Sequence, residues 1–250
     1  MSGNFNAYSS YYDLIYKDKD YVGESEYILN LLKTYGNNVQ TVVEFGSGTG
    51  KHALLFCQNG LSVVGVEPSQ EMLNIANNNS HPNLSFKLDT IATYKSDNRY
   101  DAALSLFHVI SYLNTNKELR EAFENVNKHL KEGGLFIFDV WYSAAVLNLV
   151  PEKRTKTIEN DLIQVVRYAN PINHWNKNII DVNYDIEITE KNDKLKHHIK
   201  ETHSMRHFSI PEIEMLAHVA GFQILHTEEF GTSNLPGPQT WGVCFVLKKL

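Results

Sequence analysis

The 250-residue sequence has few cysteines, no long apolar run and no dense stretch of lysine and arginine. Its two cysteines, Cys57 and Cys244, form no Cys-x-x-Cys motif, which argues against a disulfide framework or a zinc ribbon. No apolar run approaches the length of a membrane span, and the first residues lack the basic and apolar regions of a secretory signal. These absences predict a cytoplasmic protein in which both cysteines are packing residues.

Charge and composition restrict the partners of the chain. The net charge is −6 and the calculated isoelectric point is about 6.0, so the basic surface that a nucleic-acid backbone requires is absent from the composition. The eleven histidines, including the pair His197-His198, show no combination with carboxylates that has metal-ligand spacing. We therefore predict no nucleic-acid partner, no membrane partner and no metal. An apolar content of 42% suffices for one domain with an elaboration.

The most informative stretch is the apolar run Val42–Phe45 followed by Gly46, Gly48 and Gly50. Glycines in a turn after a strand allow backbone N–H groups to approach a ligand without interference from a Cβ atom. Glu67 follows the next apolar run, at about the distance where an acidic residue receives a ribose in nucleotide-binding folds. The pattern predicts a ribose-bearing cofactor.

The spacing of the loop disfavours two common nucleotide sites. A dinucleotide fingerprint would place its third glycine at position 51, where the chain has Lys51. A phosphate-binding P-loop would need glycine at Phe45 and serine or threonine at His52. Neither a pyrophosphate site nor a P-loop is therefore indicated.

The remaining pattern, E-x-G-x-G-x-G from Glu44 with an acidic residue after the second strand, resembles class I S-adenosylmethionine (SAM)-dependent methyltransferases. Asp89, the segment Asp101–His108 and the segment Lys131–Asp139 resemble later elements of the same family, in the same order. The resemblance implies SAM as cofactor, with S-adenosylhomocysteine as product. It assigns cofactor binding to Tyr12, Tyr21, Glu44, Gly46, Ser47, Gly48, Gly50, Glu67, Pro68, Met72, Asp89, Thr90, Leu106 and Phe107.

The order of predicted elements indicates an α/β fold with an insertion. A helix from about 24 to 35 precedes alternating strands and helices over 41–139, which require a doubly wound, Rossmann-like parallel sheet. Three segments rich in β-formers follow, at 161–168, 179–188 and 194–203, and predict an inserted antiparallel sheet. A helix at 212–219 and strands at 222–227 and 241–247 then complete the core. The predicted domains are 1–140 with 208–250 as the core, including an N-terminal cap at 1–36, and 141–207 as an acceptor platform or lid.

Several segments outside the cofactor motifs resemble sugar N,N-dimethyltransferases that act on nucleotide-linked amino sugars. The segments on which this resemblance rests are Tyr11–Tyr21, Leu106–Leu113, Asp139–Tyr142, Glu201–Phe208 and Gly237–Gly242. The family pattern has serine at His108, tryptophan at Tyr142 and arginine at Trp241. Since these departures lie on the acceptor side, the resemblance implies a shared cofactor and leaves the acceptor open. It also implies a homodimer.

The acceptor side supplies the catalytic candidates. Methyl transfer depends mainly on alignment of donor and nucleophile, and a base that removes the acceptor proton assists it. His108 is the first candidate base, and Tyr12 is the second catalytic candidate, expected to close on the sulfonium together with Tyr21. His203 and Arg206 lie three residues apart in one predicted strand and therefore on opposite faces. The predicted substrate residues are Tyr16, Tyr112, Trp141, Tyr142, His203, Arg206 and Trp241.

The sequence thus predicts a SAM-dependent methyltransferase acting on an amino or hydroxyl group of a small molecule, most specifically a nucleotide-linked deoxysugar. Three alternatives stay open: a methyltransferase of another small metabolite, a non-catalytic SAM-binding subunit and a nicotinamide dehydrogenase. In the non-catalytic alternative, Tyr142 or Trp241 would block the acceptor pocket.

Overall fold

The computed structural model describes residues 14–250, so the predicted site residue Tyr12 lies outside the described residues. The helices are α2 (Tyr21–Tyr35), α3 (Lys51–Gln58), α4 (Gln70–Ala76), α5 (Asn116–His129), α6 (Ser143–Leu149), α7 (Ile210–Val219) and the 3₁₀ helix η2 (Val109–Tyr112). The strands are β1 (Thr41–Phe45), β2 (Ser62–Glu67), β3 (Leu84–Leu88), β4 (Tyr100–Ser105), β5 (Leu130–Tyr142), β6 (Arg154–Glu159), β7 (Ile163–His174), β8 (Ile179–Glu190), β9 (Lys196–Phe208), β10 (Phe222–Glu229) and β11 (Gly242–Lys249).

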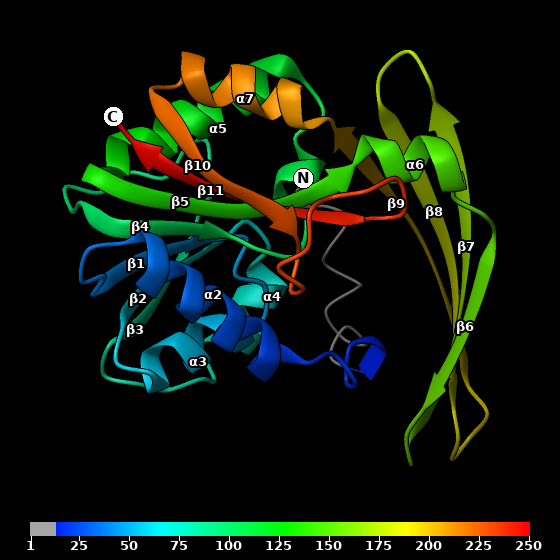
Figure 1. Cartoon of the computed structure of the whole chain (residues 1–250). Helices are drawn as coiled ribbons and strands as arrows, with labels where there is room; N and C mark the ends of the chain where they lie inside the picture. The colour runs from blue at the N-terminus through cyan, green and yellow to red at the C-terminus, as the bar shows by residue number, and fades with distance from the viewer. Residues whose placement is uncertain (1–13) are drawn as a thin grey trace.

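The core sheet has the spatial order β3-β2-β1-β4-β5-β11-β10. The first five strands are parallel, whereas β11 runs antiparallel to both β5 and β10. In Figure 1, α5 and α7 cover one face of this sheet, and α2 and α3 cover the other. The predicted fold class, a doubly wound α/β sheet with an inserted antiparallel sheet, is confirmed.

Each face of the core sheet buries its own apolar cluster. Phe123 of α5 and Phe138 of β5 belong to one cluster, and Ile28 of α2 and Phe56 of α3 belong to the other. All four side chains are fully buried. Because helices cover both faces, the central strands contain consecutive buried residues instead of alternating ones, as in β1.

Local capping fixes where the helices begin. Thr115 and Glu118 form a capping box at the start of α5, each accepting a hydrogen bond from the backbone of the other. Ser209 caps α7 ahead of Pro211, and Ser69 caps α4. The cap at Ser69 lies two residues after Glu67, the last residue of β2, so α4 begins close to the end of that strand.

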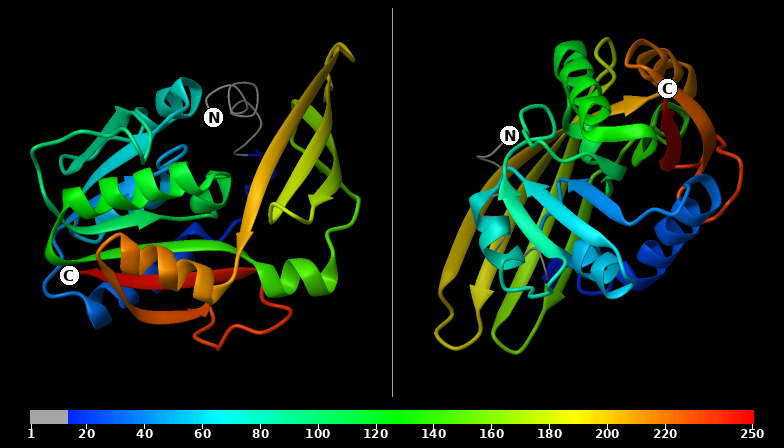
Figure 2. Two further views of the ribbon diagram at one scale, coloured as in Figure 1. Left: turned by 90° about the horizontal axis from the view of Figure 1, so that it is seen from above. Right: turned by 90° about the vertical axis from the view of Figure 1, so that its left-hand side faces the viewer.

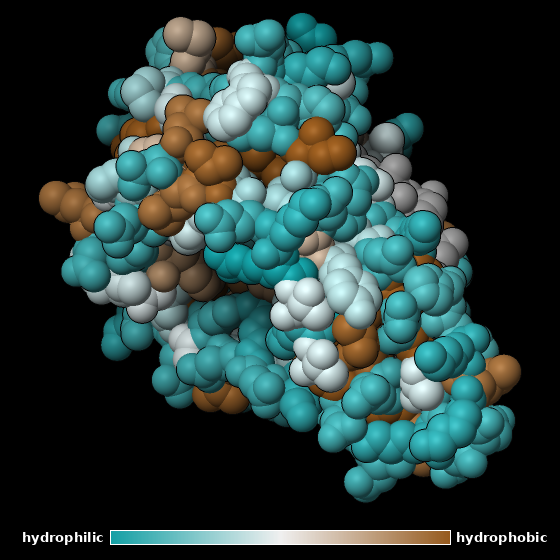
Figure 3. Space-filling view, turned by 90° about the vertical axis from the view of Figure 1, so that its right-hand side faces the viewer, coloured by the Kyte–Doolittle hydropathy of each residue, from teal (hydrophilic) through white to brown (hydrophobic). Residues whose placement is uncertain are grey.

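Strands β6 to β9 form an antiparallel sheet that extends from one end of the core (Figure 2). Its outer side belongs to a mainly hydrophilic surface with several hydrophobic groups (Figure 3). Its inner face carries an apolar cluster that includes Val165 and Ile186 and packs against Ile15 and Met72. The domain boundaries drawn from the sequence stay a prediction.

Strand β5 joins the two sheets. Beyond Phe138, where its pairing with β4 ends, Trp141 and Tyr142 pair in parallel with His207 and Phe208 of β9. Thirteen residues make this strand long enough to serve the core and the insertion together. The inserted sheet is therefore held to the core by backbone hydrogen bonds.

The structure differs from the sequence-based prediction at three places. Strand β6 and helix α6 were not predicted; β6 has a single buried residue, Ile158, and α6 is short and lacks a side-chain N-cap. The segment 131–134, which the sequence analysis did not describe as part of a strand, is an irregularity inside β5, because the partners of Tyr100 and Ala102 on β5 are Leu130 and Leu135. Among residues 14–250, no helix has both the length and the apolar character needed to cross a membrane.

Replacement of Phe138 by alanine tests the packing of the core. Because this ring is fully buried against Phe123, Phe136 and Phe245, its loss should lower the free energy of unfolding by about 3–5 kcal/mol. Urea denaturation measures the change. Leu235→Ala is the control, since Leu235 is 87% exposed and should cost less than about 0.5 kcal/mol. Equal costs for the two variants would contradict the described core.

Candidate functional site

The loop between β1 and α3 is a tight glycine turn. Gly46, Gly48 and Gly50 have φ angles of 71°, 55° and 77°, a region that L-residues with side chains seldom adopt. The N–H groups of Gly46 and Ser47 donate to the carbonyl of Val66 at 2.7 and 3.2 Å, which ties the loop to the end of β2. The turn therefore leaves the backbone around Gly48 facing the space above the strand ends.

Glu67 closes this turn from the end of β2. Its side chain is buried, and its two oxygens accept hydrogen bonds from the N–H groups of Gly48 and Ser69, both at 2.9 Å. Burial raises the pKa of Glu67 above its ordinary value, while the two backbone donors act in the opposite direction. Each carboxylate oxygen keeps a second lone pair that can accept a ligand hydroxyl.

Glu44 is the second buried carboxylate of the site. Burial and the nearby charge of Glu67 raise the pKa of Glu44 to about 8. Its Oε1 lies 4.0 Å from Nδ1 of His52, and its Oε2 has no hydrogen-bond partner among residues 14–250. A buried acceptor without a partner is costly, and a ligand that supplies a donor offsets that cost.

Residues of the N-terminal segment and of α3 form the wall beside Glu44. Lys19 makes an ion pair with Glu24 and lies over the ring of Phe107, with Nζ 4.1 Å from the ring centroid. The ring of Tyr21 lies 5.0 Å from that of His52. This end of the cavity therefore combines cations, carboxylates and aromatic rings.

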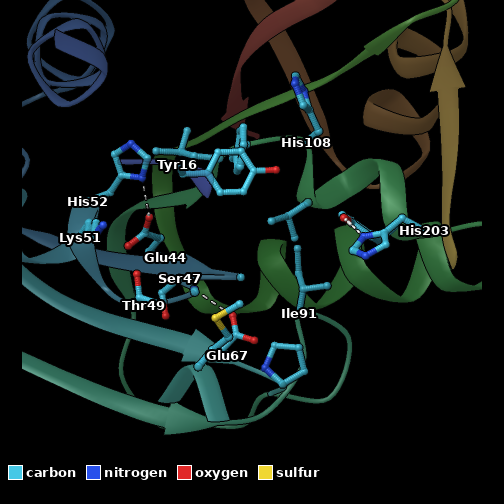
Figure 4. Close-up of a pocket in the computed structure, with 18 of the residues that line it drawn as sticks. Tyr16, Glu44, Ser47, Thr49, Lys51, His52, Glu67, Ile91, His108 and His203 are labelled. Carbon is cyan, nitrogen blue, oxygen red and sulfur yellow. Dashed lines mark hydrogen bonds and ion pairs between the residues drawn. The ribbon is translucent and has the colours of Figure 1, made fainter. Parts of the chain in front are cut away.

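These groups line a cavity of about 410 Å³, within the ~300–1,000 Å³ typical of small-molecule sites. Figure 4 shows His52 and His203 at opposite ends of it, with Ser47 and Glu67 between them along the lower side. The lining residues are Tyr16, Lys19, Tyr21, Glu44, Gly46, Ser47, Gly48, Thr49, Lys51, His52, Glu67, Pro68, Met72, Thr90, Ile91, Leu106, Phe107, His108, Val109, Tyr112, Leu113, Trp141, Val182, Tyr184, His203 and Met205.

The donor set fits a ribose-bearing, cationic cofactor. A Cβ atom built on Gly48 would have no atom within 4 Å, so this glycine faces open space in the cavity. Glu67 offers carboxylate lone pairs to ribose hydroxyls, and Glu44 offers an unpartnered oxygen to an ammonium group. Pro68, Met72 and Ile91 add apolar surface for a base.

The far end of the cavity is formed by the insertion and by η2. The hydroxyl of Tyr112 lies 2.8 Å from Nδ1 of His203, whose Nε2 lies 3.3 Å from Oε2 of Glu201. The ring of Tyr184 makes an edge contact with His203, with a centroid distance of 5.1 Å. Burial, together with nearby acidic groups including Glu201, raises the pKa of Tyr112 well above that of an ordinary phenol.

His108 lies at the rim of the cavity. Its Nδ1 lies 2.6 Å from Oδ2 of the buried Asp139, and its backbone N–H donates to the same carboxylate. In Figure 4 the ring of His108 is directed away from Glu67 and Ser47. Since His108 and Phe107 both have positive φ angles, of 62° and 64°, Asp139 stabilises a strained loop. The role of His108 as a base stays a prediction.

Two of the predicted cofactor residues lie outside the cavity lining. Gly50 is next to the ring of Phe86, and a Cβ there would lie 2.5 Å from the ring, so packing requires this glycine. The carboxylate of Asp89 accepts hydrogen bonds from the backbone of Thr90 and the hydroxyl of Thr93, so it is used within its own turn. The loop pattern alone did not separate glycines that face a ligand from those that face the core.

Three predicted substrate residues also lie outside the cavity lining. Tyr142 packs on the main core cluster, and Trp241 packs against Trp141 with ring centroids 6.1 Å apart. Arg206 points to the other face of β9, as its spacing from His203 predicted, and makes an ion pair with Glu212 at 2.6 Å. Neither Tyr142 nor Trp241 therefore lines the cavity.

Ten lining residues were missed by the sequence analysis. The alternating pattern of β8 places Val182 and Tyr184 on one face, which could have indicated them. Nothing in the local pattern identified Lys19, because it reaches the cavity through the fold of the N-terminal segment. The others are Thr49, Lys51, His52, Ile91, Val109, Leu113 and Met205. Within residues 14–250, no group of three or more His, Cys, Asp or Glu side chains is arranged to hold a metal ion.

Comparisons with known proteins agree with this geometry. Residues 42–134 match the family model described as a methyltransferase domain. YqeM of Bacillus subtilis (strain 168), which is named as a methyltransferase, is 23% identical, with 98% of this chain and 97% of YqeM covered. The dTDP-3-amino-3,4,6-trideoxy-alpha-D-glucopyranose N,N-dimethyltransferase of Streptomyces venezuelae is also 23% identical, with 87% and 90% covered.

A solved structure shows the same fold over the whole chain. The S-adenosylmethionine-dependent methyltransferase from Clostridium acetobutylicum ATCC 824 superposes with a TM-score of 0.81 at 21% identity, covering 98% of this chain and 99% of that one. These findings confirm the resemblance to class I SAM-dependent methyltransferases and the fold class, and they support SAM as the cofactor.

Substitutions at two loop glycines should separate ligand contact from packing. In Gly48→Ala the methyl group enters the cavity, so SAM affinity should fall roughly tenfold, or about 1.4 kcal/mol, while the left-handed backbone costs about 1–2 kcal/mol of stability. Gly50→Ala carries the same backbone cost and also collides with Phe86, so it should unfold at lower denaturant concentration. Calorimetric titration and urea denaturation measure the two effects. If Gly48→Ala and the unmodified protein bound SAM with equal affinity, the proposed contact between SAM and the backbone at Gly48 would be refuted.

The raised pKa of Glu44 predicts a pH dependence of stability. Between its unfolded pKa near 4.5 and its folded pKa near 8, the folded state binds a proton that the unfolded state has lost. The contribution of Glu44 to the free energy of unfolding is therefore fully present below about pH 4.5 and is lost as pH rises toward 8. Glu44→Gln should flatten the decline in unfolding free energy across this range. Identical profiles for the two proteins would argue against burial of a carboxyl group at this position.

Proposed function

We propose that this chain, which carries a SAM-dependent methyltransferase domain, methylates an amino or hydroxyl group of a nucleotide-linked sugar. The observation that supports this most is one continuous cavity with a carboxylate-rich donor end and a hydroxyl- and imidazole-rich acceptor end. The relative from Streptomyces venezuelae, whose name specifies an amino sugar linked to dTDP, supports the choice of acceptor class.

The lining of the acceptor end suits a sugar ring that bears one nucleophile and no phosphate. The lysines that line the cavity, Lys19 and Lys51, lie near Tyr21 at the donor end. The acceptor end instead contains Tyr112, Tyr184 and Trp141, whose faces suit a sugar ring. A diphosphate would accordingly extend outside the cavity, with the sugar inside.

In this proposal the chain's residues contribute mainly alignment and exclusion of water. Bound SAM supplies a methyl group on a sulfonium, which a nitrogen or oxygen lone pair displaces in line. Glu67 and the Gly48 loop would hold the ribose and methionyl parts, and Phe107 would shield the reacting atoms from water. Alignment of this kind is worth about 7–11 kcal/mol of the barrier.

Replacement of Glu67 by glutamine tests the donor half of the proposal. The change removes a charge and introduces an amide donor opposite the N–H of Gly48 or Ser69, so SAM affinity should fall about 10–100-fold. Titration calorimetry measures the affinity, and the exposed Glu26→Gln serves as the matched control. Unchanged affinity in Glu67→Gln would remove the carboxylate from the proposed site.

Ligand competition and turnover test the complete function. SAM and S-adenosylhomocysteine should bind in preference to NAD(H), and SAM should be consumed only with an acceptor present. Preference for NAD(H) would favour the dehydrogenase alternative. Binding of SAM without turnover, across dTDP-linked amino and hydroxy sugars, would favour another metabolite or a non-catalytic subunit. A homodimer and a cytoplasmic location stay predictions.

A further inference from the structure

We infer that Glu201, His203 and Tyr112 form a proton relay that removes a proton from an amino group of the acceptor. The inference rests on the proposed methyl transfer and specifies how its nucleophile is prepared. Tyr112 lines the cavity and would touch the acceptor, whereas Glu201 would act through His203. Glu201 is therefore a positioning residue.

The first support is the placement of polar groups on an apolar surface. The inner face of the inserted sheet includes the buried side chains of Ile180, Val182 and Met205. Glu201 and His203 occupy neighbouring positions on this face, each with a side-chain exposure of only 5%. Ionisable groups are seldom buried to this degree in an apolar surface without a partner or a function.

The second support is the continuity of the contacts. Tyr112 comes from η2 of the core, and its hydroxyl lies 2.8 Å from Nδ1 of His203 on β9. On the other side of the ring, Nε2 lies 3.3 Å from Oε2 of Glu201. With Nε2 protonated, Nδ1 is the acceptor for the tyrosine hydroxyl. The cavity, a hydroxyl, an imidazole and a carboxylate are thus connected in sequence.

The third support is an incompletely used carboxylate. Oε1 of Glu201 is buried and has no hydrogen-bond partner among the described residues. A purely structural carboxylate at this depth would be expected to satisfy both oxygens. One carboxylate directed to the imidazole suits a group that must stabilise positive charge there when a proton arrives.

The proton transfer balances without a further reactant. The N–H bond of the acceptor ammonium breaks and its proton passes to the oxygen of Tyr112, while the original Tyr112 proton passes to Nδ1 of His203. The acceptor is left with its lone pair, and His203 becomes an imidazolium next to the carboxylate of Glu201. Because burial raises the pKa of Tyr112, its hydroxyl stays protonated between transfers and conducts the proton instead of storing it.

A second histidine–carboxylate pair on the same sheet gives a matched control. His174 lies 2.7 Å from Asp181, with side-chain exposures of 38% and 27%, on the outer face. This pair has the same chemistry as His203 and Glu201, and neither residue lines the cavity. His174→Gln should therefore leave turnover unchanged.

The test measures kcat as a function of pH with a dTDP-linked amino sugar. In His203→Gln the acceptor must lose its proton to water, so kcat should fall roughly 100-fold near pH 7 and recover when the pH exceeds the ordinary pKa of the free amine. Tyr112→Phe should behave in the same way. In Glu201→Gln the carboxylate that stabilises the imidazolium of His203 is lost. The acid limb of the kcat–pH profile should therefore move to lower pH, and the plateau value of kcat should fall.

Binding and folding measurements separate this inference from the proposed function. SAM affinity should stay unchanged in the Glu201 and His203 variants, because His203 lies at the opposite end of the cavity from His52 in Figure 4 and Glu201 does not line the cavity. Urea denaturation shows that each variant still folds. If kcat of His203→Gln is unchanged, or falls equally at every pH, the relay is refuted. Failure of the unmodified protein to turn over any sugar would instead refute the proposed function.

Discussion

Two buried carboxylates at adjacent strand ends, Glu44 and Glu67, constrain the whole site. Burial disfavours the charged form of Glu44, and the charge of Glu67 adds to this effect, so the pKa of Glu44 rises to about 8. The fold relieves this cost for Glu67 through two backbone N–H donors, and one of them requires the left-handed turn at Gly48. The glycine spacing, the end of β2 and the cap of α4 follow from that requirement.

The geometry of the cavity near His203, the proposed acceptor end, has a different origin, because no backbone turn shapes it. Its polar groups come from separate parts of the chain, Tyr112 from the core and His203 from the insertion, and they meet because β5 pairs with β9. Tertiary packing therefore determines the geometry there. One end of the cavity is thus shaped by a local backbone turn and the other by packing between distant segments. This difference explains why a cofactor site can be similar among proteins whose acceptors differ.

The sequence could predict which residues of the glycine loop and of the end of β2 line the cavity, because this part of the site is encoded locally. Glycines, an acidic residue and a strand boundary within about one β-α-β unit are enough to place Gly48 and Glu67. Lys19 and Glu201 depend on contacts between distant segments, which no local pattern reports, whereas the alternation of β8 could have indicated Tyr184. Strand β6 was missed for a related reason, since an edge strand with one buried residue has almost no periodic signal.

The long strand β5 also bears on how such an enzyme can change during evolution. Its first part pairs within the core, and its last two residues carry the second sheet. A residue added or removed between these parts would displace the insertion by about 3.3 Å and turn its side chains to the opposite face. During evolution, side chains of the inserted sheet can therefore be exchanged one at a time, whereas any change in the length of β5 moves the whole inserted sheet relative to the core.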